Sequence, residues 1–227
     1  MPGEVRPTRQ AASDAVGAAG WRYVLGALCT QVRAASPADA AALAVRITEA
    51  VGPDAVTHLQ IDLRGDRVLV LLQSADVAAV TVRDVELAVE ISAAVRAAGL
   101  VTGPSSGRAV QLIEIAVDAV DIAGVRPFWK AALGYADEPG ATGPTDPLVD
   151  PLGQGPAVWF QQMDTARTQR NRIHLDVSVA HDVAAARISA ALAAGGRLLS
   201  DAAAPSFWVL ADAEGNEVCI TTWQGRD

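Results

Sequence analysis

Three histidines carry most of the chain's capacity for proton transfer or metal binding near neutral pH. His58 and His174 each begin a run of alternating apolar and polar residues, and the two runs lie in different halves of the 227-residue chain. His181 precedes a predicted helix, and we interpret it as an exposed residue without chemistry. The chemistry of imidazole is therefore confined to the neighbourhoods of His58 and His174.

The run that contains His174 repeats an earlier one. Residues 113–118 (IEIAVD) match residues 173–178 (IHLDVS), and each run is followed by a predicted helix and further strands. Two copies of such a unit usually bury a shared core, and the cleft between them is a natural ligand site. Because Glu114 and His174 occupy equivalent positions, we expect a carboxylate and an imidazole to face one cleft as acid, base or metal ligand.

Other residues near this cleft have two interpretations each. Trp159 and Trp208 either form the walls of the cleft or pack in the core. Three arginines between residues 167 and 172 either contact an anionic substrate or belong to a solvated loop. The Gly- and Pro-rich residues 138–156 either cover the cleft or form an ordinary surface loop.

Composition excludes several classes of partner. The net charge of −8 disfavours binding to nucleic acid and to anionic membranes. Cys29 and Cys219 are far apart and have no motif spacing, which indicates reduced thiols rather than a disulfide framework. No apolar run reaches the roughly 18 residues of a membrane span, and we expect no signal peptide. The sequence therefore predicts a cytoplasmic protein.

The pattern of helices, strands and breakers predicts an α+β protein with two domains. Its predicted segments are a flexible tail (1–19), a first α+β domain (20–100), a Gly/Pro/Ser-rich linker (101–108) and a second domain (109–227). In the first domain, Ser36 and Thr81 are predicted N-caps of two helices. Residues 59–72 are predicted to form a hairpin between those helices.

Longer motifs relate the second domain to a known family. They are FWKAALGY at 128–135, DPLG at 150–153, NRIHLD at 171–176 and DAEGN at 212–216. In order and spacing they resemble the glyoxalase and bleomycin-resistance fold of the vicinal oxygen chelate superfamily, in the glyoxalase-like subgroup common in actinobacteria. The resemblance implies paired βαβββ modules, a homodimer, and lyase- or isomerase-type chemistry.

The same resemblance implies metal ligands at Glu114, Gln161, His174 and Cys219. Glu114 and His174 suit a divalent metal, whereas the amide oxygen of Gln161 is a weak ligand and the Cys219 thiolate suits zinc or copper. Such a mixed set is unusual for a single metal. The prediction therefore favours a metal-free binding cleft over a divalent metal at Glu114 and His174.

The first domain resembles the pterin-4a-carbinolamine dehydratases. The resemblance rests on Gly20-Trp21, on the predicted hairpin and on the motif TxxDxxLAxxI at 81–91. That family uses two adjacent histidines and a third after the next strand. Here only His58 remains, with Thr57 and Ala75 at the other two positions. Positioned acid–base groups contribute typically 10²–10⁴-fold each, so the resemblance implies a degenerate dehydratase site. Without a relay partner, His58 is otherwise a polar residue at a strand edge.

These observations predict a two-domain protein that binds a small molecule. In the leading hypothesis, Glu114 and His174 catalyse a lyase or isomerase reaction at a carbon next to an oxygen. The first alternative is a binding protein of the resistance type, which sequesters its ligand without chemistry. The second alternative is residual dehydration of a 4a-hydroxytetrahydrobiopterin at His58.

Overall fold

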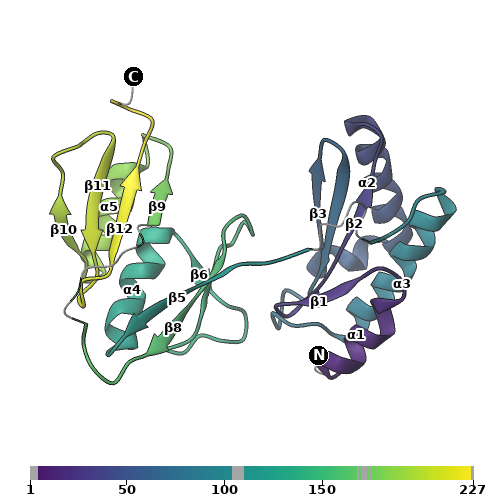
Figure 1. Ribbon diagram of the computed structural model, residues 1–227, viewed down its shortest axis with the longest axis horizontal. Helices are drawn as coiled ribbons and strands as arrows, with labels where there is room; N and C mark the ends of the chain where they lie inside the picture. Colours follow the sequence, from purple (N-terminus) through teal and green to yellow (C-terminus); the bar gives the residue numbers. More distant parts are fainter. Residues whose placement is uncertain (1–4, 104–109, 168, 170–172, 174, 226–227) are drawn as a thin grey trace. The chain divides into compact units, whose positions relative to one another are not determined.

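The computed structural model describes residues 5–103, 110–167, 169, 173 and 175–225. The chain divides into two compact units after Leu112 (Figure 1). Each unit combines helices with antiparallel or mixed sheet, which confirms the predicted α+β class. Within the described residues, no helix is both long enough and apolar enough to cross a membrane.

The first unit packs three helices on one side of a four-stranded antiparallel sheet (Figure 1). The sheet order is β1-β2-β4-β3. The strands are β1 (Arg22–Val24), β2 (Ala27–Arg33), β3 (Leu59–Arg64) and β4 (Arg67–Leu72), and the helices are α1 (Arg9–Gly17), α2 (Pro37–Val51) and α3 (Val82–Ala97). A 3₁₀ turn, η1 (Pro53–Thr57), connects α2 to β3. The predicted caps are confirmed: the Ser36 side chain accepts from the backbone of Asp39, and Thr81 begins a capping box.

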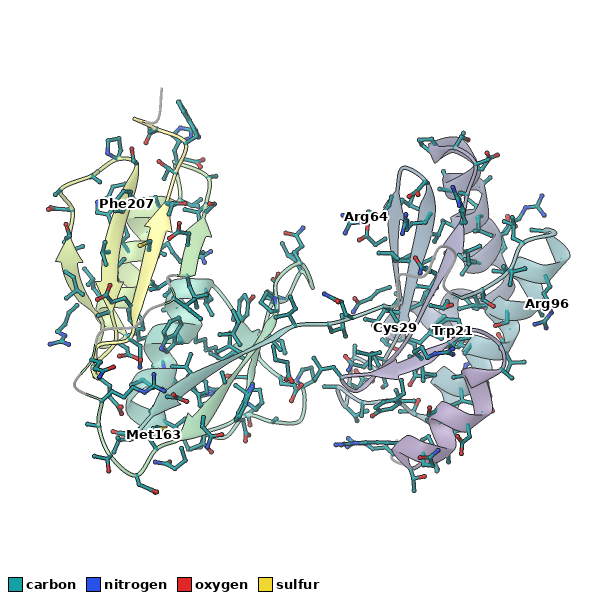
Figure 2. All side chains as sticks on the ribbon, viewed as in Figure 1. Trp21, Cys29, Arg64, Arg96, Met163 and Phe207 are labelled. Carbon is teal, nitrogen blue, oxygen red and sulfur yellow. The ribbon has the colours of Figure 1, made fainter. Side chains whose placement is uncertain are left out.

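The core of this unit follows from strand alternation. Leu28, Leu72 and Leu59 lie at one level of three neighbouring strands, on the face that meets the helices. Trp21 is fully buried beside them, and its indole N–H donates to the hydroxyl of Ser92 on α3 at 2.9 Å (Figure 2). A buried Trp pairs its N–H in this way because an unpaired polar group in a core is costly.

The predicted flexible tail is wrong for residues 9–17, which form α1. Thr8 caps this helix by accepting from the backbone of Ala11. Ala12 and Val16, one helical turn apart, are buried in the core of the unit. A stripe of two small residues is too weak a periodic signal to be recognised in the sequence, and tertiary packing stabilises the helix instead.

The first residues of the predicted linker belong to the first unit. Thr102 forms an isolated bridge with Val32, and its hydroxyl donates to the carbonyl oxygen of Ala19. Gly20 has φ +83°, and a Cβ atom there would lie 2.3 Å from the carbonyl oxygen of Thr102. Only glycine fits that close approach. Residues 104–109 lie outside the described residues.

The second unit contains two βαβββ modules, which confirms the predicted repeat. The first module comprises β5 (Glu114–Ala119), α4 (Ile122–Leu133), β6 (Ala136–Asp137), β7 (Leu148–Val149) and β8 (Ala157–Gln162). The second comprises β9 (Leu175–Ser178), α5 (Ala184–Ala193), β10 (Arg197–Ser200), β11 (Phe207–Ala211) and β12 (Glu217–Thr221). Both sheets place the first strand of the module beside its last: the orders are β5-β8-β7-β6 and β9-β12-β11-β10.

One hydrophobic core serves both modules. It joins α4 and α5 to one face of each sheet, with Phe128 and Trp129 of α4 among its largest side chains. The indole N–H of Trp129 donates to the buried Asp212 of the second module at 3.0 Å. Each sheet therefore has a helix-covered face and a helix-free face, and the candidate ligand residues divide between them.

Candidate functional site

The helix-free face of the first sheet carries an ordered row of side chains. On β5 these are Glu114, Ala116 and Asp118, because Val117 and Ala119 point into the core. Ala116 pairs with Trp159 on β8, and Asp118 pairs with Gln161. The row runs from a carboxylate, past a half-buried indole, to a second carboxylate beside an amide.

Glu114 is exposed at the start of β5. It lies near Glu138, which follows β6 and is half-buried. The pKa of Glu138 is raised above its ordinary value, first by desolvation and then by the negative charges of Glu114 and Asp146. Carboxyl groups whose environments shift their proton affinities are typical of acid–base sites.

Several contacts hold the cover segment, residues 138–156, to the first module. The buried Arg126 of α4 donates to the carbonyl oxygen of Asp146 at 2.7 Å and to the carboxylate of Asp137 at 2.7 Å. Lys130 donates to the same carboxylate at 2.7 Å, and both cations lower the pKa of Asp137. The segment is therefore anchored at its entry and again midway.

The strand register separates two of the predicted metal ligands. Glu114 pairs with Ala157, whereas Gln161 lies four residues further along β8 and pairs with Asp118. At about 3.3 Å per residue the offset is roughly 13 Å. Ligands of one metal lie about 2 Å from it, so the register does not place Glu114 and Gln161 as neighbours around one ion.

In the second module, Cys219 is buried on β12 and pairs with Asp176 of β9. Trp208 lies on the opposite face of its sheet, beside Ile220 and against the shared core. Of the two predicted cleft tryptophans, only Trp159 is therefore on a helix-free face. His174, together with two of the three loop arginines, lies outside the described residues.

The predicted metal is not supported by the donors that the structure describes. Over residues 5–103, 110–167, 169, 173 and 175–225, no group of three or more His, Cys, Asp or Glu side chains has the geometry to hold a metal ion. With Gln161 distant from Glu114, the described donor set does not fit such a site, and the chemistry below uses no metal.

The dehydratase-like site of the first unit contains a partner that sequence reasoning missed. His58 is 5% exposed, and its Nδ1 atom lies 2.9 Å from Oδ1 of the fully buried Asp84. The other carboxylate oxygen of Asp84 accepts from the backbone N–H and the hydroxyl of Thr81, each at 2.7 Å. His58 is thus a buried member of a hydrogen-bond network, and the interpretation as a strand-edge residue is wrong.

Thr57 and Ala75, the other two positions of this site, lie beside His58 and are exposed. The backbone N–H of Ala75 donates to the carbonyl oxygen of Thr57 at 2.7 Å. The signal that could have identified Asp84 was present in the sequence. A capping-box carboxylate engages only with its own helix unless a donor comes from elsewhere, and that donor lies 26 residues earlier.

Comparisons with known proteins agree with the architecture of the second unit. The family model of the glyoxalase-like domain matches residues 114–221. No curated protein matches the chain. The dehydratase-like interpretation of the first unit has no support from these comparisons and stays a prediction.

Three solved structures illustrate the match. A glyoxalase/bleomycin resistance protein/dioxygenase family enzyme from Burkholderia phytofirmans PsJN has 17% identity and a TM-score of 0.40, over 48% of this chain and 95% of that chain. A glyoxalase/bleomycin resistance protein from Albidiferax ferrireducens T118 has 19% identity and a TM-score of 0.38, over 48% and 95%. The fosfomycin resistance protein FosX from Mesorhizobium loti has 9% identity and a TM-score of 0.40, over 52% and 96%.

The family match covers both modules, from the first residue of β5 to the last of β12, and it agrees with their shared strand order. Residues 114–221 of this chain are a glyoxalase-like domain.

Proposed function

We propose that the glyoxalase-like domain binds a small molecule on the helix-free face of its first sheet and acts on it by lyase- or isomerase-type chemistry. Glu114 is the base in this proposal, and it takes a proton from a carbon next to an oxygen-bearing carbon. The observation that carries the proposal is the interaction of Glu114 with Glu138, a carboxyl group whose pKa is raised by desolvation and by the charge of Glu114.

The two carboxyl groups suit opposite roles. Glu114 is exposed and available as a proton acceptor. The raised pKa of Glu138 means that it keeps its proton to a higher pH, which suits a donor to the substrate oxygen. If Glu114 returns its proton to a neighbouring carbon, the net reaction is an isomerisation. If an adjacent hydroxyl leaves with a proton from Glu138, the net reaction is the elimination of water.

The proposal is tested by proton exchange, which requires no knowledge of the natural substrate. The full chain, purified without chelator and analysed for metal content, is incubated in D₂O with hydroxyacetone or dihydroxyacetone. NMR then follows deuterium incorporation at the carbon next to the carbonyl. We expect protein-dependent exchange that falls at least 100-fold in Glu114→Gln, the range for loss of a positioned base. Asp201→Asn, an exposed carboxylate in the second module, is the control.

Two outcomes contradict the proposal. One is the absence of protein-dependent exchange with either probe. The other is exchange that Glu114→Gln leaves unchanged. Binding of a probe without exchange favours the alternative of a sequestering, resistance-type protein. One metal ion per chain, lost in both Glu114→Gln and His174→Ala, would replace the metal-free version of the mechanism.

A second candidate function is favoured by the contact between His58 and Asp84. A buried carboxylate fixes the orientation of an imidazole and stabilises its protonated form, as acid–base catalysis requires. We propose residual dehydration of a 4a-hydroxytetrahydropterin at this site. The rate above background is expected to disappear in His58→Gln and to persist in His181→Gln. An equal rate in wild type and His58→Gln would contradict it. The homodimer that the resemblances imply also remains a prediction.

A further inference from the structure

A cavity of about 330 Å³ lies at the end of β5 that is remote from Glu114. Asp118, Val120, Met163, Arg167, Glu214 and Asn216 are among its lining residues. Met163 follows β8 and marks this end of the first sheet in Figure 2. The cavity opens beside the row of side chains on the helix-free face, because Asp118 belongs to both.

The charges around the cavity favour a cationic ligand. Asp118 and Glu214 are negative, and Arg167 is the cation among the lining residues. Glu214 has a structural role, because its two carboxylate oxygens accept from the backbone N–H groups of Val120 and Asp121 at 2.8 and 2.6 Å. The carboxylate with an exchangeable partner is therefore Asp118.

Arg167 is that exchangeable partner. It forms an ion pair with Asp118, and its side chain is 56% exposed against 26% for Asp118. Exposed ion pairs of this kind add little to stability. A ligand cation can therefore replace the guanidinium of Arg167, which comes from a loop, while Asp118 stays fixed on a strand.

The neighbouring residues supply a surface for the body of such a ligand. Trp159 pairs with Ala116, one place along the same face from Asp118, so its half-buried indole lies diagonally across from Asp118. Diagonal neighbours on adjacent strands are about 7–8 Å apart, within reach of an aromatic side chain. Indole is also the aromatic group that attracts cations best.

We propose that this cavity binds an organic cation with a flat apolar body. Its ammonium or amidinium group pairs with Asp118 in place of Arg167, and its body lies along Trp159 toward Glu114. The inference rests on the proposed function only in placing the reacting end of the ligand at Glu114. Binding at Asp118 is measured without any reaction, so the two proposals fail separately.

The test compares three probes of similar shape and different charge. Phenethylamine is cationic, 3-phenylpropionate anionic and 3-phenylpropanol neutral, and each is titrated calorimetrically into the full chain. We expect phenethylamine to bind at least tenfold more tightly than the other two. Asp118→Asn is expected to weaken it at least tenfold, and Asp118→Glu, which keeps the charge, to weaken it less.

Arg167→Gln gives the sharpest readout, because the proposal predicts a gain. Removing the internal competitor is expected to tighten phenethylamine binding at least twofold, whereas the control Arg197→Gln leaves it unchanged. Three results overturn the proposal: no charge preference among the probes, no binding of phenethylamine, or preferred binding of phenylpropionate that is lost in Arg167→Gln. Retained phenethylamine binding in Glu114→Gln, together with absent proton exchange, would remove the proposed reaction alone.

Discussion

The Nδ1 atom of His58 lies 2.9 Å from Oδ1 of Asp84, and both side chains are buried although they are 26 residues apart in the chain. Asp84 therefore has two roles. It caps α3 through Thr81, and it fixes the imidazole of His58. A group with both roles connects the stability of the first unit to the geometry of its candidate site.

Asp84→Ala is expected to lower the stability of the first unit by about 3 kcal/mol or more, because it leaves buried donors on Thr81 and His58 without their acceptor. Denaturant unfolding of the full chain measures this change. The matched control is Asp62→Ala on the same unit, where the lost partner is an exposed Arg64 and the expected change is within about 0.5 kcal/mol. Equal effects of the two substitutions would refute a central role for Asp84.

Gly20→Ala is expected to lower the free energy of unfolding by more than about 1 kcal/mol. The new Cβ atom would lie 2.3 Å from the carbonyl oxygen of Thr102, and φ is +83°. Gly65→Ala is the control, because its Cβ would meet nothing within 4 Å and its φ is not in the left-handed region. Thermal melting of both variants decides the question; similar melting temperatures would contradict the close approach of Thr102.

Arg126→Ala is expected to release the cover segment, residues 138–156, and to cost about 2–3 kcal/mol, since it removes hydrogen bonds from a buried cation. Hydrogen exchange measured by mass spectrometry should rise in peptides from this segment and stay unchanged in those of α5. Arg197→Ala, which removes one long hydrogen bond to Asp212, is the control. Unchanged exchange in the segment would mean that other contacts hold it.

Glu138→Gln tests the raised pKa of Glu138 through its effect on stability. The folded state binds the Glu138 proton more tightly than the unfolded state does, because desolvation and the charges of Glu114 and Asp146 disfavour the carboxylate. The stabilising contribution of this proton is therefore present at low pH and is lost as pH rises through the folded pKa. Glu138→Gln should thus raise the melting temperature at pH 7 and have a smaller effect near pH 4. The opposite order would show that the pKa is not raised.

Local signals in the sequence predicted much of the fold. The cap residues Ser36 and Thr81 located two helix starts, and the match between residues 113–118 and 173–178 located β5 and β9. By contrast, β6 and β7 have two residues each, too short for any alternation to be visible. Helix α1 was missed because its buried stripe consists of Ala12 and Val16 alone.

The candidate sites were less predictable, because they depend on register and on long-range contacts. Periodicity placed Glu114 and Gln161 on strands, but which residue lies opposite which is set by strand pairing, and that pairing separates them. A similar limit applied to Trp208, whose side of the sheet depends on a one-residue choice of phase. The contact of His58 with Asp84 joins elements that no local pattern connects.

Chemical rescue of Glu114→Ala is the most direct test of the central claim, that an exposed carboxylate on β5 acts as the base. Added formate can occupy the space of the deleted carboxylate, because Glu114 is exposed. The account predicts that deuterium exchange into hydroxyacetone, lost in Glu114→Ala, returns at least tenfold with formate, while formate leaves the wild type unaffected. Exchange that formate does not restore, or that it increases equally in both proteins, would contradict the assignment of Glu114 as the base.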